Sequence, residues 1–283
     1  GMSLLYVTAD QVGAESGGGL VTKHESEALA GLGPCDVWGR EQLGEFDGDV
    51  WKQDSRLAAY LSDELTSARP PLIYGVELTH FYSGTFPESV KILKAKGIKV
   101  VYTIAAHDRE QSRYEHEKVW GIPFSYPHLV DPELWKKYIE GYRLADVIVC
   151  PSKIAAQIVR DYGPEFRDKD IRIIPHGVNI PSVKCTECGG YGKIGIGPND
   201  ITDWEYCHGC KGVGSILKPI TPIPKKFTVG YLGACGPDKG LVYLLQAWKK
   251  LNYSDATLVI AGRDSTSPWF RQLVQTHGGG SVI

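Results

Sequence analysis

Four of the seven cysteines stand in two matching C-x-x-C pairs near the middle of the chain. The stretch CTECGGYG at 185–192 is followed by CHGCKGVG at 207–214, and both fit the pattern C-x-x-C-x-G-x-G. Zinc prefers four thiolates at the corners of a tetrahedron, and each C-x-x-C turn supplies two of them. The 18 residues between the pairs are within the usual range for such sites. The spacing therefore predicts a structural Zn²⁺ site whose ligands are Cys185, Cys188, Cys207 and Cys210.

Two other interpretations of the cysteine pairs remain open, namely a redox dithiol and two turns that share no metal. A redox C-x-x-C usually starts a helix after a strand, whereas these pairs lie among glycines. Four protein ligands leave no position for water or substrate, so we expect a structural zinc and no catalytic metal. The pairs resemble the C-x-x-C-x-G-x-G hairpins of J-domain co-chaperones over about 30 residues, which implies a metal but not chaperone activity.

Composition and charge narrow the class of protein. The chain has 283 residues, enough for two domains, with 42% hydrophobic and 23% charged residues, as in soluble globular proteins. The net charge of -2 argues against a general nucleic-acid binder. No apolar run reaches the ~20 residues that a membrane span needs. With no secretory signal and four cysteines in metal-type pairs, we expect a cytoplasmic protein without a membrane span.

Short apolar runs alternate with amphipathic segments as far as about residue 175. The predicted strands are 4–9, 35–39, 71–77, 98–105, 146–152 and 171–177. The predicted helices are 18–33, 54–68, 86–97, 131–145 and 152–163. Strand–helix alternation with strands buried on both faces favours a parallel, doubly wound α/β sheet.

A second unit repeats this pattern after residue 225. Strands are predicted at 226–233 and 256–262, and helices at 239–251 and 267–278. A parallel sheet of this size buries little surface alone, so we expect either that the chain is a fragment with an incomplete second domain or that its second domain is abnormally short. The expected parts are an N-terminal Rossmann-like domain at 1–180, a zinc hairpin insert at 181–220, and the start of a second Rossmann-like domain at 221–283.

Two features could bind phosphate. Gly17, Gly18 and Gly19 stand between a predicted strand and a predicted helix, where free backbone N–H groups favour anions. The alternative is a plain strand-to-helix loop, and because this loop is not G-x-G-x-x-G it gives no support for a dinucleotide site. Lys239 precedes a predicted helix and could place a cation beside a diphosphate, the alternative being a solvated lysine.

Several segments in a fixed order resemble one family. ADVIVCPSKIAAQIVRDYG followed by IRIIPHGVNIP resembles the end of the N-terminal domain in retaining glycosyltransferases of the GT-B fold, family 4. FTVGYLGACGPDKGLVYLLQAW and ATLVIAG resemble that family's entry into the donor domain, and the glycine triplet and VVYTIAAHD match in place and order. The resemblance covers nearly the whole chain except the insert. It implies a GT-B-like fold, with an acceptor domain followed by a nucleotide-sugar (donor) domain.

The resemblance also implies an activity and its residues. It implies transfer of a sugar from a UDP-, GDP- or ADP-sugar to an unknown acceptor, with retention and without a catalytic metal. It places His107 against the transferred sugar, with Asp108 beside it, and Lys239 against the diphosphate. The alternative for His107 is a histidine at a strand end that is capped by its neighbour. Ala234 stands where the family usually has an arginine. The family's acidic E-x7-E element would lie beyond Ile283, so we expect the chain to be part of a longer protein whose activity alone is open.

Glu77 and His80 are acceptor-side candidates, because they follow a predicted strand. Two other functions remain open. One is a non-catalytic relative whose zinc hairpin docks protein or nucleic acid, although the insert mixes lysines with acidic residues. The other is a different nucleotide-binding α/β enzyme, such as a sugar-nucleotide epimerase, against which the missing dinucleotide fingerprint counts.

Overall fold

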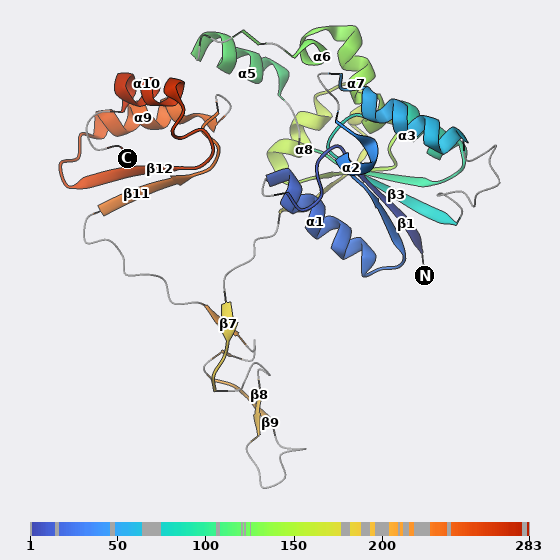
Figure 1. Cartoon of the computed structure of the whole chain (residues 1–283), viewed down its shortest axis with the longest axis horizontal. Helices are drawn as coiled ribbons and strands as arrows, with labels where there is room; N and C mark the ends of the chain where they lie inside the picture. The colour runs from blue at the N-terminus through green and yellow to red at the C-terminus, as the bar shows by residue number, and fades with distance from the viewer. Residues whose placement is uncertain are drawn as a thin grey trace. The chain divides into compact units, whose positions relative to one another are not determined.

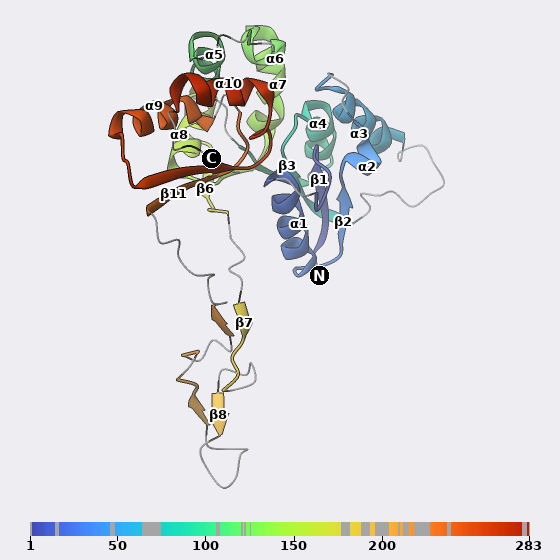
Figure 2. The same cartoon turned by 60° about the vertical axis from the view of Figure 1, so that its left-hand side comes forward.

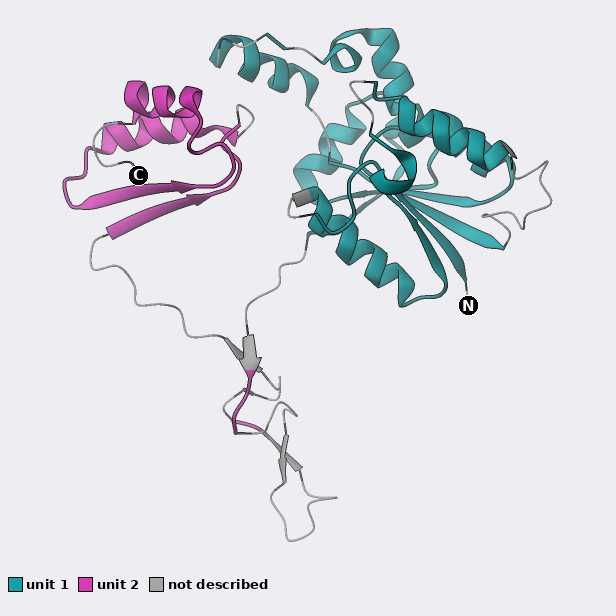
Figure 3. Ribbon diagram, in the orientation of Figure 1, with its two compact units in different colours: residues 1–176 teal, residues 177–283 magenta. Residues whose placement is uncertain are grey.

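The computed structural model of the chain divides into two compact units, residues 1–176 and 177–283 (Figure 3). The structure describes residues 2–14, 17–45, 49–63, 75–105, 108–119, 121, 123–124, 126–176, 182–187, 193–195, 204–208, 210–211, 215–217, 227–236, 239–278 and 282.

Unit 1 is built on a six-stranded sheet in the order β2-β1-β3-β4-β5-β6, and all five strand pairs are parallel (Figure 1). The chain runs outward from β1 to β2 and then returns across β1 to β3. The direction of winding therefore reverses between β1 and β3, and in open parallel sheets ligands bind outside the carboxyl ends of the strands at such a switch point. The strands are β1 (Ser3–Thr8), β2 (Cys35–Trp38), β3 (Val76–Tyr82), β4 (Lys99–Thr103), β5 (Val147–Cys150) and β6 (Asp170–Ile173).

Helices cover both faces of this sheet. Leu5 and Val7 of β1 belong to a core cluster that also contains Leu57 of α3 and Leu93 of α4. Tyr6, between them in sequence, points to the other face and contacts Glu25 of α1, as strand alternation requires. Helix α1 lies on the opposite side of the sheet from α3 and α4 (Figure 2). The helices are α1 (Gly17–Ala30), α2 (Arg40–Leu43), α3 (Lys52–Asp63), α4 (Pro87–Ala95), α5 (Arg109–Tyr114) with its π-helical continuation (Glu115–Val119), α6 (Pro127–Val130), α7 (Pro132–Leu144) and α8 (Lys153–Arg160), before a 3₁₀ turn (Pro164–Phe166).

Local sequence signals start and stop these helices. Pro87 occupies the first turn of α4, and Gly97 follows its end with a φ of 75° that favours glycine. Ser152 caps α8, because its hydroxyl accepts a hydrogen bond from the Ala155 N–H at 3.1 Å. Asp131 caps α7 by accepting hydrogen bonds from the N–H groups of the second and third helical residues.

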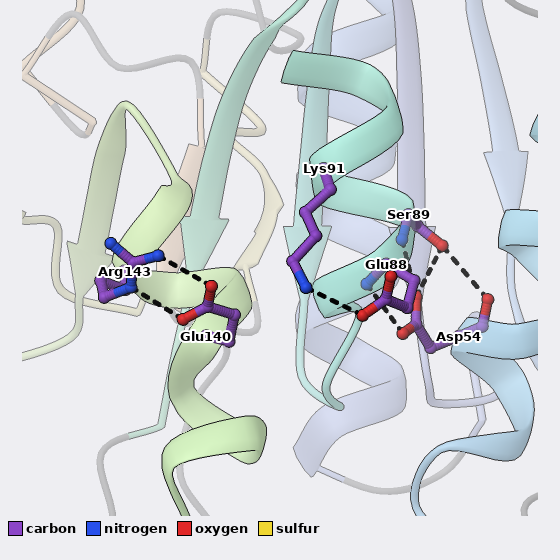
Figure 4. Close-up of polar contacts among 6 residues, drawn as sticks. All are labelled: Asp54, Glu88, Ser89, Lys91, Glu140 and Arg143. Atoms are coloured by element: carbon purple, nitrogen blue, oxygen red, sulfur yellow. Dashed lines mark hydrogen bonds and ion pairs between the residues drawn. The ribbon is translucent and has the colours of Figure 1, made fainter. Parts of the chain in front are cut away.

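A buried carboxylate links α3 to α4 (Figure 4). Asp54 is 2% exposed and accepts hydrogen bonds from the backbone N–H groups of Glu88 (3.0 Å) and Ser89 (2.9 Å) and from the Ser89 hydroxyl (2.7 Å). It therefore caps α4 from a neighbouring helix. Burial raises the pKa of Asp54, and the hydrogen bonds from Ser89 and Glu88 offset part of that rise.

One predicted strand is misplaced. The bounds of the predicted strand at 71–77 are wrong where the structure describes them, because β3 runs from Val76 to Tyr82 and is preceded by a turn at Gly75, which has a φ of 80°. Residues 71–74 lie outside the described part of the chain. Glu77 and His80 are thus inside a strand rather than after one.

Unit 2 contains a βαβ unit with a following helix, as predicted. β11 (Phe227–Leu232) and β12 (Ala256–Ala261) are parallel, with α9 (Leu241–Leu251) between them and α10 (Pro268–His277) after them. Leu258 also forms a parallel bridge with Val282. The earlier part of the unit holds four short strands, β7 (Ser182–Lys184), β8 (Lys193–Gly195), β9 (Trp204–Tyr206) and β10 (Ser215–Leu217). The predicted α/β class, with Rossmann-like topology in both units, is confirmed.

Candidate functional site

The loops after β1 and β3 meet at the switch point of unit 1. A Cβ added to Gly84 would lie 2.7 Å from the Cβ of Ala9, so the two loops are in close contact. Ser83 and Gly84 both have left-handed backbones, with φ of 59° and 71°. A left-handed non-glycine residue is strained, and such strain gathers at ligand sites. This edge of the sheet is therefore the candidate site of unit 1.

The glycine triplet forms the first turn of α1 beside these loops. A Cβ on Gly18 would lie 2.7 Å from Asp10 Oδ2, and one on Gly19 would lie 2.4 Å from the Ala14 carbonyl oxygen. Gly19 is thus required by close packing against the backbone of the loop that follows β1, whereas the contact at Gly18 is with the movable end of the Asp10 side chain. Asp10 also brings a carboxylate to the start of the helix. Phosphate binding by Gly17, Gly18 and Gly19 stays a prediction.

A buried polar network lies between α1 and the sheet. The Tyr6 hydroxyl donates to Glu25 Oε2 at 2.9 Å, and His80 Nε2 lies 2.8 Å from Thr103 Oγ1 and 3.7 Å from Glu25 Oε2. The members come from β1, α1, β3 and β4. Tyr6 is fully buried, so the phenol depends on Glu25 for its hydrogen bond. The network fixes α1, and with it the glycine turn, to three strands of the sheet.

Burial governs the protonation of this network. Desolvation lowers the pKa of His80 to about 4, so its imidazole is neutral at neutral pH. Desolvation raises the pKa of Glu25, and hydrogen bonds from Tyr6 and Thr103 oppose the rise. Burial, followed by the charges of Asp10 and Glu25, raises the pKa of Tyr82 to about 12. His80 is therefore a neutral structural contact under the helix.

The two acceptor-side candidates do not come together. Glu77 is exposed and is the second residue of β3, at the end of the strand away from the switch point. His80 faces α1 within the buried network.

Of the two catalytic candidates, only Asp108 lies in the described part of the chain. His107 lies outside the described residues. Asp108 is exposed and caps α5, accepting a hydrogen bond from the Gln111 N–H at 3.0 Å. It also lines a cavity of about 280 Å³ beside Trp135 of α7 and Asp161 at the end of α8. The Arg109 guanidinium lies 4.8 Å from the centre of the Trp135 ring in the same wall.

In unit 2, Lys239 and Arg263 follow the carboxyl ends of the two parallel strands. Lys239 is exposed and stands just before α9, and the Arg263 side chain, 78% exposed, follows β12. The two loops are joined: Cys235 N donates to the Arg263 carbonyl at 2.9 Å, and a Cβ on Gly262 would lie 1.9 Å from the Gly233 oxygen. One edge therefore carries two cations, although Ala234 stands at the expected arginine position.

Three of the four predicted zinc ligands come together. The sulfur atoms of Cys185, Cys207 and Cys210 all lie within 4.8 Å of one another, and the three residues are buried. Cys185 Sγ and Cys207 Sγ are 3.7 Å apart, too far for a disulfide. Cys188 lies outside the described residues.

Sequence reasoning missed four residues of unit 1: Asp10, Tyr6, Glu25 and Thr103. Asp10 directly follows a predicted strand, which is a usable signal for a ligand edge. Tyr6 and Thr103 each lie within an apolar run that predicts a buried strand, so their sequence context does not mark them as site residues. Glu25, in KHESEAL, has the pattern of a solvated helix face. Only the pairing of α1 with the sheet shows that these side chains meet.

Comparison with known proteins gives one family match. Residues 44–181 match the model described as Glycosyltransferase Family 4, slightly less than half of the chain. The matched region runs from α3 to β6 and includes neither the glycine triplet nor Lys239. No curated protein matches the chain.

Among solved structures, the S. aureus MnaA-UDP co-structure aligns with a TM-score of 0.47 at 12% identity, covering 99% of this chain and 67% of that chain. The apo form of the lipopolysaccharide outer core galactosyltransferase WaaB also scores 0.47, at 13% identity, covering 100% and 67%. UDP-GlcNAc 2-epimerase from Methanocaldococcus jannaschii scores 0.43 at 9% identity, covering 99% and 72%. These similarities are too distant to carry an argument about ligand or activity.

The fold and the site define a Rossmann-like α/β protein with a candidate ligand edge in each unit. Within the part of the chain that the structure describes, no helix is both long enough and apolar enough to cross a membrane.

Proposed function

We propose that this chain is a glycosyltransferase that takes its sugar from a nucleotide-sugar donor. The observation that carries the proposal is the match of residues 44–181 to Glycosyltransferase Family 4. The matched region contributes β3 and its left-handed loop to the β1/β3 switch point, where α/β folds bind ligands. UDP-, GDP- and ADP-sugars all remain candidate donors.

Sugar transfer releases a nucleoside diphosphate, so negative charge grows on the leaving group. In unit 2, Lys239 and Arg263 offer cations at the carboxyl edge of β11 and β12. In unit 1, the first turn of α1 offers backbone N–H groups, held in place by the Tyr6–Glu25 contact. The Asp10 carboxylate beside that turn would repel phosphate, so we assign it to sugar hydroxyl groups.

The reaction itself needs no protein nucleophile in this proposal. The donor's departing phosphate takes the proton of the acceptor hydroxyl on the same face of the sugar, which retains the configuration. His107 is proposed to contact the transferred sugar, on the family resemblance. Because the Asp108 carboxylate caps α5, we assign it to positioning that loop rather than to proton transfer.

Calorimetric titration of the full chain with UDP, GDP and ADP tests donor binding. We expect one nucleotide to bind and Lys239→Ala to weaken it by roughly 1.5–3 kcal/mol, the usual size of a charged hydrogen bond. Lys250→Ala is the matched control, because Lys250 is exposed at the other end of α9. No binding of any nucleotide, or equal loss in both variants, would contradict the donor site.

Product analysis separates transfer from the other candidate functions. Incubation with the bound donor and a panel of acceptor sugars and lipids should release the nucleoside diphosphate and form a glycoside. Isomerised donor without release would identify an epimerase. Binding without any turnover would favour a non-catalytic relative.

A further inference from the structure

Three cysteines of unit 2, Cys185, Cys207 and Cys210, stand between two small antiparallel ribbons. β7 pairs with β10, with Lys184 opposite Ser215, and β8 pairs with β9, with Lys193 opposite Tyr206. The pairing is nested, since the inner ribbon lies between the strands of the outer one along the chain. Cys185 directly follows β7, and Cys207 directly follows β9. Each C-x-x-C pair therefore occupies a connection between the outer and inner ribbons.

The sulfur positions fit a tetrahedral metal. A Zn–S bond is about 2.3 Å, so two sulfurs on one tetrahedral zinc should lie about 3.8 Å apart. Cys185 Sγ and Cys207 Sγ are 3.7 Å apart, and Cys210 Sγ lies within 4.8 Å of both. A disulfide would need about 2.05 Å. The spacing is that of thiolates sharing one ion.

The burial of the three cysteines also supports a shared metal ion. Cys185, Cys207 and Cys210 are 2%, 0% and 6% exposed, and these three residues alone make up the buried cluster found in the described part of this segment. Ribbons of three-residue strands bury too little apolar surface to hold together unaided. A metal that bridges both connections supplies the missing cross-link.

We propose that residues 182–217 form a zinc-bound hairpin in which Cys185, Cys207 and Cys210 are ligands. The fourth ligand is Cys188, assigned from its C-x-x-C spacing alone. On binding, the four thiols lose their protons to solvent, and Zn²⁺ with four thiolates carries a net charge of -2. Exposed Lys184 and Lys211 flank Cys185 and Cys210 in sequence and offset that charge. The site is closed, so it supports structure rather than catalysis.

Glu187 is the competing fourth ligand. Its Oε2 lies 3.2 Å from Cys207 Sγ, where it accepts a hydrogen bond from the thiol. Two substitutions separate the candidates: Cys188→Ser should abolish stable zinc binding, whereas Glu187→Gln should leave it intact. The reverse result would overturn the assignment of Cys188.

The test is metal analysis of the full chain, purified without a chelator and freed of any histidine tag. We expect about one zinc per chain, near zero in Cys207→Ser, and no change in Cys35→Ser, a cysteine of β2 in unit 1. Because Cys207→Ser could fail to fold, Co²⁺ is also titrated into metal-free wild-type chain. A tetrahedral thiolate spectrum at one equivalent supports the site. Absence of zinc together with absence of that spectrum overturns it.

Discussion

Unit 1 and the cysteine hairpin at 182–217 are held together by different means. Unit 1 buries a cluster of large apolar and aromatic side chains, in which Phe81 packs against Phe86 and Tyr102 with ring centres 5.2 and 5.1 Å apart. Among the described residues of the hairpin, the buried cluster consists of three cysteines. A sheet with helices on both faces removes enough surface from water to fold alone, whereas two short ribbons need a cross-link.

The difference teaches that the candidate ligand edge of unit 1 and the proposed zinc site belong to separately stabilised parts of the chain. The candidate ligand edge of unit 1 rests on its apolar core and on the Tyr6–Glu25–His80 network. The proposed zinc site has four protein ligands and therefore no open position. Changes to one region should leave the other intact, and the Phe81 variant and the hydrogen-exchange experiment below test that independence.

The largest effect is expected from a cavity in the core of unit 1. Phe81 is fully buried, so Phe81→Ala should destabilise unit 1 by about 3–5 kcal/mol. Zinc content should stay at the wild-type value. Phe227→Ala is the control, because Phe227 is 64% exposed at the start of β11 and its loss should cost less than about 0.5 kcal/mol. Urea unfolding combined with metal analysis measures both quantities, and loss of zinc in Phe81→Ala would break the comparison.

The next effect is a loss of stability in acid that is specific to unit 1. His80 has a folded-state pKa of about 4 against an ordinary value near 6.5. Between these values the unfolded chain binds a proton that the folded chain rejects, so stability falls as pH falls through this window, by up to roughly 3 kcal/mol. His80→Gln should remove that loss, as read by urea unfolding at several pH values.

Glu25, which faces His80 and Tyr6, has the opposite effect. Its folded-state pKa is raised, so the folded chain takes up a proton more readily and gains stability as pH falls through that pKa. Glu25→Gln should therefore steepen the acid loss of the wild type. Tyr82 and Asp10 are the other titratable groups that act on this face. An unchanged pH profile in both variants would show that the network is not a buried titrating unit.

A smaller effect is expected at the link between α3 and α4. Asp54→Ala leaves the start of α4 without its three hydrogen bonds and should cost about 1–3 kcal/mol. Glu140→Ala is the matched control, since it removes the more exposed pair with Arg143, at 2.7 Å for both contacts, and should cost at most about 1 kcal/mol (Figure 4). Thermal unfolding of both variants should give this order, and equal losses would show that burial does not set the difference.

Most of the fold could be predicted because its signals are local. Ser152 before α8, Pro87 in α4 and Gly97 after it each mark a boundary through a backbone requirement. The cysteine pairs are local too, since ligand type and spacing carry the prediction. Apolar runs placed β1, β4 and β5 for the same reason.

The rest depends on contacts between distant segments. In β3 the apolar residues are interrupted by Glu77, Thr79 and His80, so the signal for a strand is weaker there than in the apolar run before Gly75, where the strand is predicted. The polar side chain of His80 can be buried at this position because Thr103, on β4, and Glu25, on α1, are its partners. No periodicity within one segment reveals such a network. The left-handed backbone of Ser83 at the switch point is likewise not signalled by the residues around it in sequence.

The most direct test of the account is hydrogen exchange on the full chain before and after zinc is removed with a chelator. We expect amides of 182–184, 204–206 and 215–217 to become fast, while amides of β1, β3 and β4 keep their protection, because the apolar core does not depend on the metal. Readdition of zinc should restore the hairpin. Loss of protection in the sheet of unit 1, or no change in the hairpin, would contradict the separation of the two regions.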